Sequence, residues 1–184
     1  YFTCTPGQYR KRNIKTLIRL PLSQTSLIPI RIEHKSPFIL VGDHGAVKGF
    51  AAAQPDFHQV IPLHWQNILE KNPHWVTEEK TLFGAFINTS NAQGHFDYWA
   101  GIEDKSNLAL KNGINLPDQS YAVISHRNAI SHFSLTVSWF IDCWLPQSQL
   151  IYQSGADLES YPQSSLSIKQ LTAEYWIPIK NHPL

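Results

Sequence analysis

The chain has 184 residues, with 15 Lys and Arg against 14 Asp and Glu and a hydrophobic fraction of 42%, which fits one globular domain with its own core. No apolar run approaches the roughly 20 residues that a helix needs to cross a membrane, so the sequence excludes a membrane-spanning helix. Two cysteines, Cys4 and Cys143, exclude a disulfide framework, and without a secretory signal they favour a reducing, cytoplasmic location.

Positive charge is concentrated in the first 35 residues. They hold seven Lys and Arg and one acid, Glu33, whereas the remainder is mildly acidic. This basic arm is either a solvated leader or a sign that the chain adjoins a part that binds nucleic acid. Because the chain contains no methionine, not even at position 1, we expect it to begin inside a longer protein.

In chain order, the pattern first divides the chain into three parts. Residues 1–13 are predicted to end a helical unit, and residues 14–28, which show no clean period, are predicted to form a linker. The domain itself is expected over 29–184. It begins with a predicted strand at Pro29–Val41 and a predicted turn region at Gly42–Gly49.

The strongest predicted helix is Pro55–Asn72. Its apolar residues recur at intervals of three and four, a proline suits its start, and Asn72-Pro73 ends the pattern. Leu82–Asn88 and His95–Glu103 follow as two predicted strands across a turn of Asn, Ser and Gly.

The second half of the domain has the same order of elements. Leu116–Gln119 is predicted to be a turn and Ser120–His126 a strand. Ser131–Leu145 is the second predicted helix, with Ser131 as its N-cap. Gly155–Tyr161 and Leu171–Ile179 are the last predicted strands.

The two halves also match residue by residue. FDYWAGIE at Phe96–Glu103 aligns with AEYWIPIK at Ala173–Lys180, FILVG from Phe38 aligns with YAVIS from Tyr121, and the two helices align between them. Each half is thus predicted as a β-α-β-β module. The expected fold class is α+β, with duplicated modules in pseudo-twofold symmetry, an antiparallel sheet and a central ligand cleft at the seam.

One predicted strand carries two acids. Asp157, Glu159 and Tyr161 share a face of it, opposite Leu158, because side chains alternate along a strand. If that face meets the core or the cleft, a carboxylate lies in an aromatic environment. In the alternative, Leu158 points inward and both acids are solvated.

Trp139 lies outside the apolar stripe of the second predicted helix, on a second apolar strip with Leu135. It is either buried under a loop or forms a wall of the cleft. A Trp face beside a carboxylate would suit an organic cation.

The sequence contains no motif for a metal or a cofactor. Its nine histidines show no ligand spacing, and it has no G-x-S-x-G, Walker A or G-x-G-x-x-G motif. We therefore expect neither a metal nor a cofactor, and Cys143 is interpreted as a small core residue.

The segment FTCTPGQYRKR resembles the end of the DNA-binding domain of AraC/XylS-type transcription regulators. A TP-x-x-YR signature closes the second helix-turn-helix there, and it matches Thr5, Pro6, Tyr9 and Arg10. The resemblance implies that residues 1–13 are the tail of such a domain and that the DNA-reading helices precede Tyr1.

The rest of the chain, about Pro29 to Ile179, resembles the gyrase-inhibitor-like (GyrI-like) effector-binding domain, in an order similar to Rob-type activators. The resemblance is carried by LP-x-x-x-YAV from Leu116, WLP-x-S from Trp144, Glu-x-Tyr at Glu159, WIPIK from Trp176 and HWQNILEKNP in the first module. Gln149 and Leu150 stand where the family often has Gly and an aromatic residue, a departure at the rim of the pocket.

The resemblance implies a cleft between two modules, with Glu159 as a buried counter-ion for lipophilic cations. We add Tyr161, Trp139, Trp99 and Phe86 as the expected aromatic lining. The expected function is that of the sensor domain of an AraC-family regulator of the multidrug type. It would bind an amphiphilic, cationic small molecule, with DNA contacted through the preceding domain, RNA polymerase as a candidate partner and no membrane contact.

Two other functions stay open. Some GyrI-like relatives act as hydrolases, so Glu159 could activate water instead, and the domain could be a protein-interaction module with a vestigial cleft. The basic arm and the TP-x-x-YR signature favour a regulator, so we expect no enzymatic activity.

Overall fold

The computed structural model describes residues 29–49, 52–78, 80–89, 94–104, 112–129, 132–162, 166–167 and 170–181. The predicted AraC-type tail at 1–13 and the predicted linker at 14–28 lie outside these ranges. Within them, no helix is both long enough and apolar enough to cross a membrane.

In the described part of the chain, ten strands form one sheet in which every pairing is antiparallel. Eight of them lie in the order β1-β6-β10-β8-β3-β4-β2-β5, and β7 and β9 pair with β10. The strands are β1 (Ile30–Lys35), β2 (Phe38–Lys48), β3 (Leu82–Asn88), β4 (His95–Asp104), β5 (Gly113–Leu116), β6 (Gln119–Asn128), β7 (Leu150–Tyr152), β8 (Asp157–Tyr161), β9 (Leu166–Ser167) and β10 (Gln170–Asn181).

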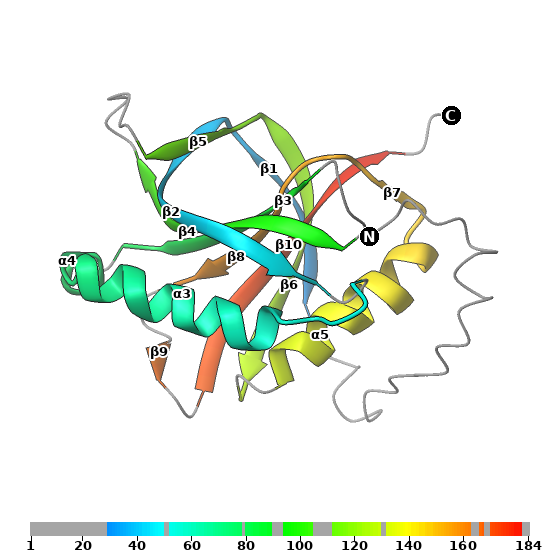
Figure 1. The fold of residues 1–184 in the computed structure, drawn as a ribbon. Helices are drawn as coiled ribbons and strands as arrows, with labels where there is room; N and C mark the ends of the chain where they lie inside the picture. Colours follow the sequence, from blue (N-terminus) through cyan, green and yellow to red (C-terminus); the bar gives the residue numbers. More distant parts are fainter. Residues whose placement is uncertain are drawn as a thin grey trace.

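The helices lie on one face of this sheet (Figure 1). They are α3 (Phe57–Lys71), the short α4 (His74–Thr77) and α5 (Phe133–Trp139). The helix predicted at Ser131–Leu145 is less regular than expected, because α5 continues as a π-helix over Phe140–Trp144 and a 3-10 turn over Leu145–Gln147. Its predicted cap, Ser131, lies outside the described residues.

The duplication predicted from the sequence is confirmed, and with it the α+β fold class. The modules are β2-α3-β3-β4 and β6-α5-β8-β10, and they meet where β3 pairs with β8. In that pairing Ala85 lies opposite Leu158. Ala85 also pairs with Trp99 in the first module, as Leu158 pairs with Trp176 in the second. The pseudo-twofold axis therefore passes through the Ala85–Leu158 pair.

The sheet is strongly curled (Figure 1). β1 pairs with β6 at one end of the strand order, whereas β2, which follows after a connection of only two residues, pairs with β5 at the other end. So short a connection requires the two ends of the sheet to approach each other. One buried cluster fills the inside of the curl and includes Leu40, Ala85, Val123 and Leu158. Two further clusters join α3 and α5 to the opposite face.

The predicted turn region at Gly42–Gly49 is wrong, because β2 continues through it to Lys48. β2 pairs with β4 from Ile39 to Lys48, and in this register Gly42 lies opposite Gly101. A β-carbon on Gly42 would stand 1.9 Å from the carbonyl oxygen of Ala100. The glycine therefore permits a close approach of two strands, which sequence reasoning took for a turn. The single strand predicted at Pro29–Val41 is in fact divided between β1 and β2.

Candidate functional site

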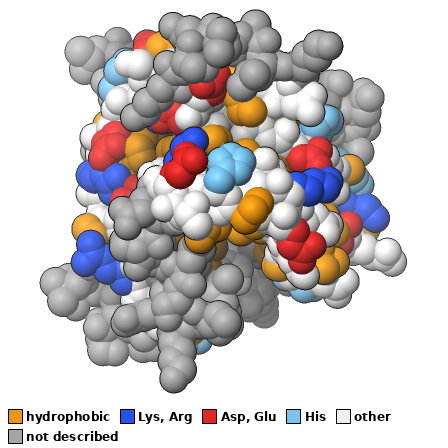
Figure 2. All heavy atoms as spheres, turned by 90° about the vertical axis from the view of Figure 1, so that its left-hand side faces the viewer, with side chains coloured by type: hydrophobic (Ala, Val, Ile, Leu, Met, Phe, Trp, Pro, Cys, Tyr) orange, Lys and Arg blue, Asp and Glu red, His pale blue; other side chains and the backbone are white. Residues whose placement is uncertain are grey.

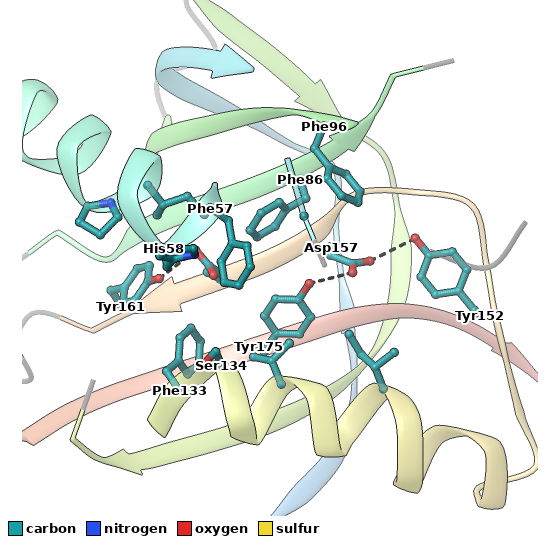
Figure 3. Close-up of a pocket in the computed structure, with 16 residues that line it drawn as sticks. Phe57, His58, Phe86, Phe96, Phe133, Ser134, Tyr152, Asp157, Tyr161 and Tyr175 are labelled. Carbon is teal, nitrogen blue, oxygen red and sulfur yellow. Dashed lines mark hydrogen bonds between the residues drawn. The ribbon is translucent and has the colours of Figure 1, made fainter. Parts of the chain in front are cut away.

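A cavity of about 500 Å³ opens between α3 and α5, above the central strands β3 and β8 (Figure 3). Its walls are mostly aromatic and aliphatic, and both of its carboxylates come from β8, whereas His58 and Ser134 come from the helices. The described lining residues are Gly49, Phe57, His58, Ile61, Pro62, Phe86, Phe96, Phe133, Ser134, Val137, Ile141, Tyr152, Asp157, Glu159, Tyr161 and Tyr175.

Glu159 lies at the base of this cavity and is 6% exposed. Its Oε2 accepts a hydrogen bond of 2.8 Å from the hydroxyl of Tyr161 and another of 2.8 Å from the hydroxyl of Tyr98. The Tyr98 hydroxyl in turn accepts a hydrogen bond of 2.8 Å from the indole N–H of Trp65 on α3. Burial raises the pKa of Glu159 to about 7, although the two tyrosine hydrogen bonds oppose the shift.

Asp157 is a second carboxylate in the same cavity, and Figure 3 shows its two hydrogen bonds. The hydroxyl of Tyr175 donates to its Oδ2 at 2.9 Å, and that of Tyr152 donates to its Oδ1 at 3.2 Å. Burial raises the pKa of Asp157 to about 6, again against the two hydrogen bonds. Burial also raises the pKa of Tyr175, so its hydroxyl stays a donor at neutral pH.

The position of β8 explains why a buried acid, Glu159, and a half-buried one, Asp157, lie together. It pairs with β10 and β3 on its two edges, and its two faces pack against different clusters, one inside the curl and one under the helices. Leu158 is fully buried inside the curled sheet, and its neighbours Asp157 and Glu159 therefore point to the helix-covered face. The alternative prediction, in which Leu158 points inward and both acids are solvated, is correct for Leu158 and wrong for the acids. Leu158 does point inward, but the acids face the cavity.

The pocket does not share the symmetry of the fold. The register pairs Phe86 with Tyr98 and Glu159 with Tyr175, which makes Phe86 the counterpart of Glu159. By the same register Gly84 is the counterpart of Asp157. The acids thus come from the second module alone.

Gly84 also makes room for the contact between the modules. A β-carbon there would stand 2.3 Å from the Tyr98 hydroxyl and 2.9 Å from Oε2 of Glu159. Without a side chain at this position, Tyr98 of the first module reaches over β3 to the acid of the second.

Three of the five residues predicted from the sequence come together in the cavity, namely Glu159, Tyr161 and Phe86. The other two predictions, Trp139 and Trp99, are corrected because neither side chain lines it. Trp139 packs against the core between α5 and the sheet.

Trp99 lies on the opposite face of β4 from Tyr98. It packs against the cluster inside the curl and stacks on the ring of His44 at 4.4 Å. The Trp99 side chain therefore packs inside the curled sheet, on the face away from the ligand cavity.

Sequence reasoning missed Tyr98, Tyr175 and Tyr152 as site residues, and it placed Asp157 on the right face without including it in the site. A signal for two of them was present, since the repeated Tyr-Trp pair gives Tyr98 and Tyr175. Only the register with β3 and β8 shows that the tyrosine of each pair lies on the helix-covered face and the tryptophan on the opposite face.

The arrangement can neutralise positive charge on a ligand and surround its apolar part with aromatic rings. Neither carboxylate forms an ion pair with a Lys, Arg or His side chain in the described ranges. Those ranges also contain no cluster of three or more His, Cys, Asp and Glu suited to a metal. On the face seen in Figure 2, by contrast, acidic, basic and hydrophobic side chains are interspersed.

The duplicated modules and the cavity at their seam define an effector-binding class of domain. The chain belongs to the family of integron-associated effector binding proteins, Cass2, which matches residues 31–179. A comparison with curated proteins finds no match.

Several solved structures share the fold. SAV2435 bound to tetraphenylphosphonium has a TM-score of 0.63 and 16% identity, with 83% of this chain and 94% of that chain covered. EcmrR in a complex with DNA has a TM-score of 0.56 and 13% identity, with 85% and 59% covered. The integron cassette protein VCH_CASS2 of Vibrio cholerae has a TM-score of 0.52 and 16% identity, with 82% and 95% covered.

Proposed function

We propose that this chain is the sensor domain of a transcription regulator and that it binds an amphiphilic cation in the cavity between its modules. The observation that carries the proposal is a buried carboxylate, Glu159, beside a half-buried one, Asp157, in an aromatic cavity where neither forms an ion pair with a Lys, Arg or His side chain of the described residues.

An empty cavity of this kind is energetically unfavourable for charged acids. A buried carboxylate without a counter-charge is strongly disfavoured, so it takes up a proton or a cation. The raised pKa of Glu159, about 7, reflects this. A lipophilic cation would restore the charge balance, and its apolar groups would pack on Phe86 and Tyr161, whose ring faces favour positive charge. The tetraphenylphosphonium complex of SAV2435 supports this ligand class.

The regulator part of the proposal has two supports. The TP-x-x-YR signature at Thr5–Arg10 resembles the end of an AraC-type DNA-binding domain. In the EcmrR–DNA complex, a domain of this fold is part of a longer chain, because this chain covers 59% of it. We therefore place DNA contact in an N-terminal domain, with RNA polymerase as a candidate partner.

The test of ligand binding uses two probes of matched shape and opposite charge, tetraphenylphosphonium and tetraphenylborate, in calorimetric titrations at pH 8. The protein should bind the cation and reject the anion. Glu159→Gln keeps the shape of the side chain and removes its charge, so we expect at least roughly tenfold weaker binding of the cation. Glu70→Gln, on the exposed side of α3, is the matched control and should bind as the unaltered protein does. Equal binding of both probes would refute the proposal.

The test of the regulator role is a gel-shift titration with the 184-residue chain. We expect weak binding without sequence preference, because the basic arm contacts phosphates and phosphate contacts carry no sequence information. A clear preference for one DNA sequence would show that base-reading residues lie within this chain.

A second candidate function rests on the pKa of Glu159. A carboxylate with a pKa near 7 is well suited to act as a general base, and Glu159 lines a cavity large enough for a small substrate. Turnover of small esters and lactones that is lost in Glu159→Gln would identify a hydrolase. Binding without turnover would support the sensor function. Because the basic arm and the TP-x-x-YR signature favour a regulator, we propose that the chain is not an enzyme.

A further inference from the structure

The cavity contains two separate acceptor sites for positive charge. Glu159 is held by Tyr98 and Tyr161, and Asp157 is held by a different pair, Tyr152 and Tyr175. The two acids are two residues apart on β8 and point to the same face. At a rise of about 3.3 Å per residue, their positions on the strand are roughly 7 Å apart.

A ligand with a single charge would leave one of these carboxylates without a counter-charge. The proximity of Asp157 is itself one of the causes that raise the pKa of Glu159, so the two acids repel each other when both are ionised. His58 is the basic side chain among the described lining residues, and it is exposed. Because the described lining residues offer no further cationic side chain, we take the second positive charge from the ligand.

The opposite wall of the cavity shows where the rest of the ligand would lie. Because the counterparts of the two acids on β3 are Gly84 and Phe86, negative charge is confined to one wall. Phe57, Phe86 and Phe96 form an aromatic wall on the side of the first module, as Figure 3 shows. A fitting ligand has an aromatic body and carries its charges along one edge.

We infer that the cavity selects aromatic dications whose two cationic centres are about 7 Å apart, one facing Glu159 and the other Asp157. This inference rests on the proposed function, because it names the ligand class of the same cavity.

Ethidium and propidium provide a matched test. They share the phenanthridinium ring and its single charge, and propidium adds a quaternary ammonium group on a propyl chain. Binding is measured by fluorescence titration at pH 8, where both acids are ionised, on protein freed of nucleic acid. The protein should bind propidium at least tenfold more tightly than ethidium.

Two variants test which of the two acids binds which positive charge of the dye. Asp157→Asn keeps the shape of the side chain and one of the two acceptor oxygens, so one of the Tyr152 and Tyr175 hydroxyls must turn to accept from the amide. It should lower propidium affinity more than ethidium affinity, which reduces the preference for propidium to less than threefold. Glu159→Gln should weaken both dyes. Glu70→Gln, which removes one negative charge outside the cavity, should bind propidium more tightly than ethidium by the same factor as the unaltered protein does.

The outcomes separate this inference from the proposed function. Equal affinity of the unaltered protein for ethidium and propidium would overturn the selection of dications and leave the cation sensor intact. The same holds if tetraphenylphosphonium binds and neither dye does. If none of the three cations binds, the proposed function fails and the inference fails with it. The comparison of dyes on the unaltered protein does not depend on whether a variant folds.

Discussion

The hydroxyl of Tyr98 donates a hydrogen bond of 2.8 Å to Oε2 of Glu159, although the two residues belong to different modules of the duplicated fold. Tyr98 is fully buried on β4, and Glu159 lies on β8 beyond β3. This bond fixes the acid of one module to the tyrosine of the other. The geometry of the cavity therefore depends on how the modules meet, and changes at their seam should alter ligand binding and stability together.

Gly84→Ala should show this dependence. The new methyl group would stand 2.3 Å from the Tyr98 hydroxyl and 2.9 Å from Glu159 Oε2, so one of the two must move. We expect a loss of about 1–3 kcal/mol in the free energy of unfolding, measured with urea, and weaker binding of tetraphenylphosphonium. Gly45→Ala is the control, because its methyl group would meet only the ring of His64 at 3.8 Å. Equal stability of the two variants would contradict the tight contact at Gly84.

Tyr98→Phe removes a hydroxyl that accepts from Trp65 and donates to Glu159. The indole N–H loses its partner, and the expected destabilisation is about 1–3 kcal/mol in urea unfolding. Loss of a donor should also raise the pKa of Glu159 further, which a carbon-detected NMR titration can follow. Tyr161→Phe also removes one donor to Oε2 but no partner of Trp65, so it should be less destabilising. If Tyr161→Phe were the more destabilising of the two variants, the hydrogen bond between Trp65 and Tyr98 would contribute little to stability.

The sequence predicted most of the fold, because a duplication is visible without any knowledge of register. It failed at Gly42–Gly49, since glycine is read locally as a turn signal. A glycine is required at position 42 because the backbone of β4, which is distant in sequence, lies too close for a side chain. Local pattern does not contain that information.

The site was predicted in part for a related reason. Glu159 and Tyr161 follow from the alternation of a single strand. Which of Tyr98 and Trp99 lies on the helix-covered face depends on how β4 is paired. Neighbouring residues of a strand point to opposite faces, so the sequence alone leaves both assignments open. Trp139 lies where α5 passes into the π-helix, so ideal helical spacing does not fix its direction.

His126 should make the protein less stable in mild acid. Its buried ring interacts through Nδ1 with the hydroxyl of Thr136 at 2.9 Å, and burial lowers its pKa below 6.5. The unfolded state therefore binds the proton more readily, so this contribution to stability is present above about pH 6.5 and is lost as the pH falls through the lower folded pKa. Comparing urea unfolding of the unaltered protein and His126→Gln between pH 5 and 8 measures this. The exposed His74→Gln is the control and should follow the unaltered protein.

Glu159 should have the opposite effect on the empty protein. Its pKa is about 7 in the folded state and 4.5 for a free side chain, so the folded state binds more protons between these values. The free energy of unfolding should therefore fall as the pH rises from about 4.5 to about 7, by up to about 3 kcal/mol from this residue alone. Glu159→Gln does not titrate. Its stability relative to the unaltered protein should increase over that window, whereas Glu70→Gln should give a constant difference. Saturating tetraphenylphosphonium should make this slope shallower for the unaltered protein, because the cation stabilises the ionised acid and so lowers its pKa. A constant difference between Glu159→Gln and the unaltered protein across the whole range would mean that Glu159 titrates as a solvated side chain, and the counter-ion role would then be abandoned.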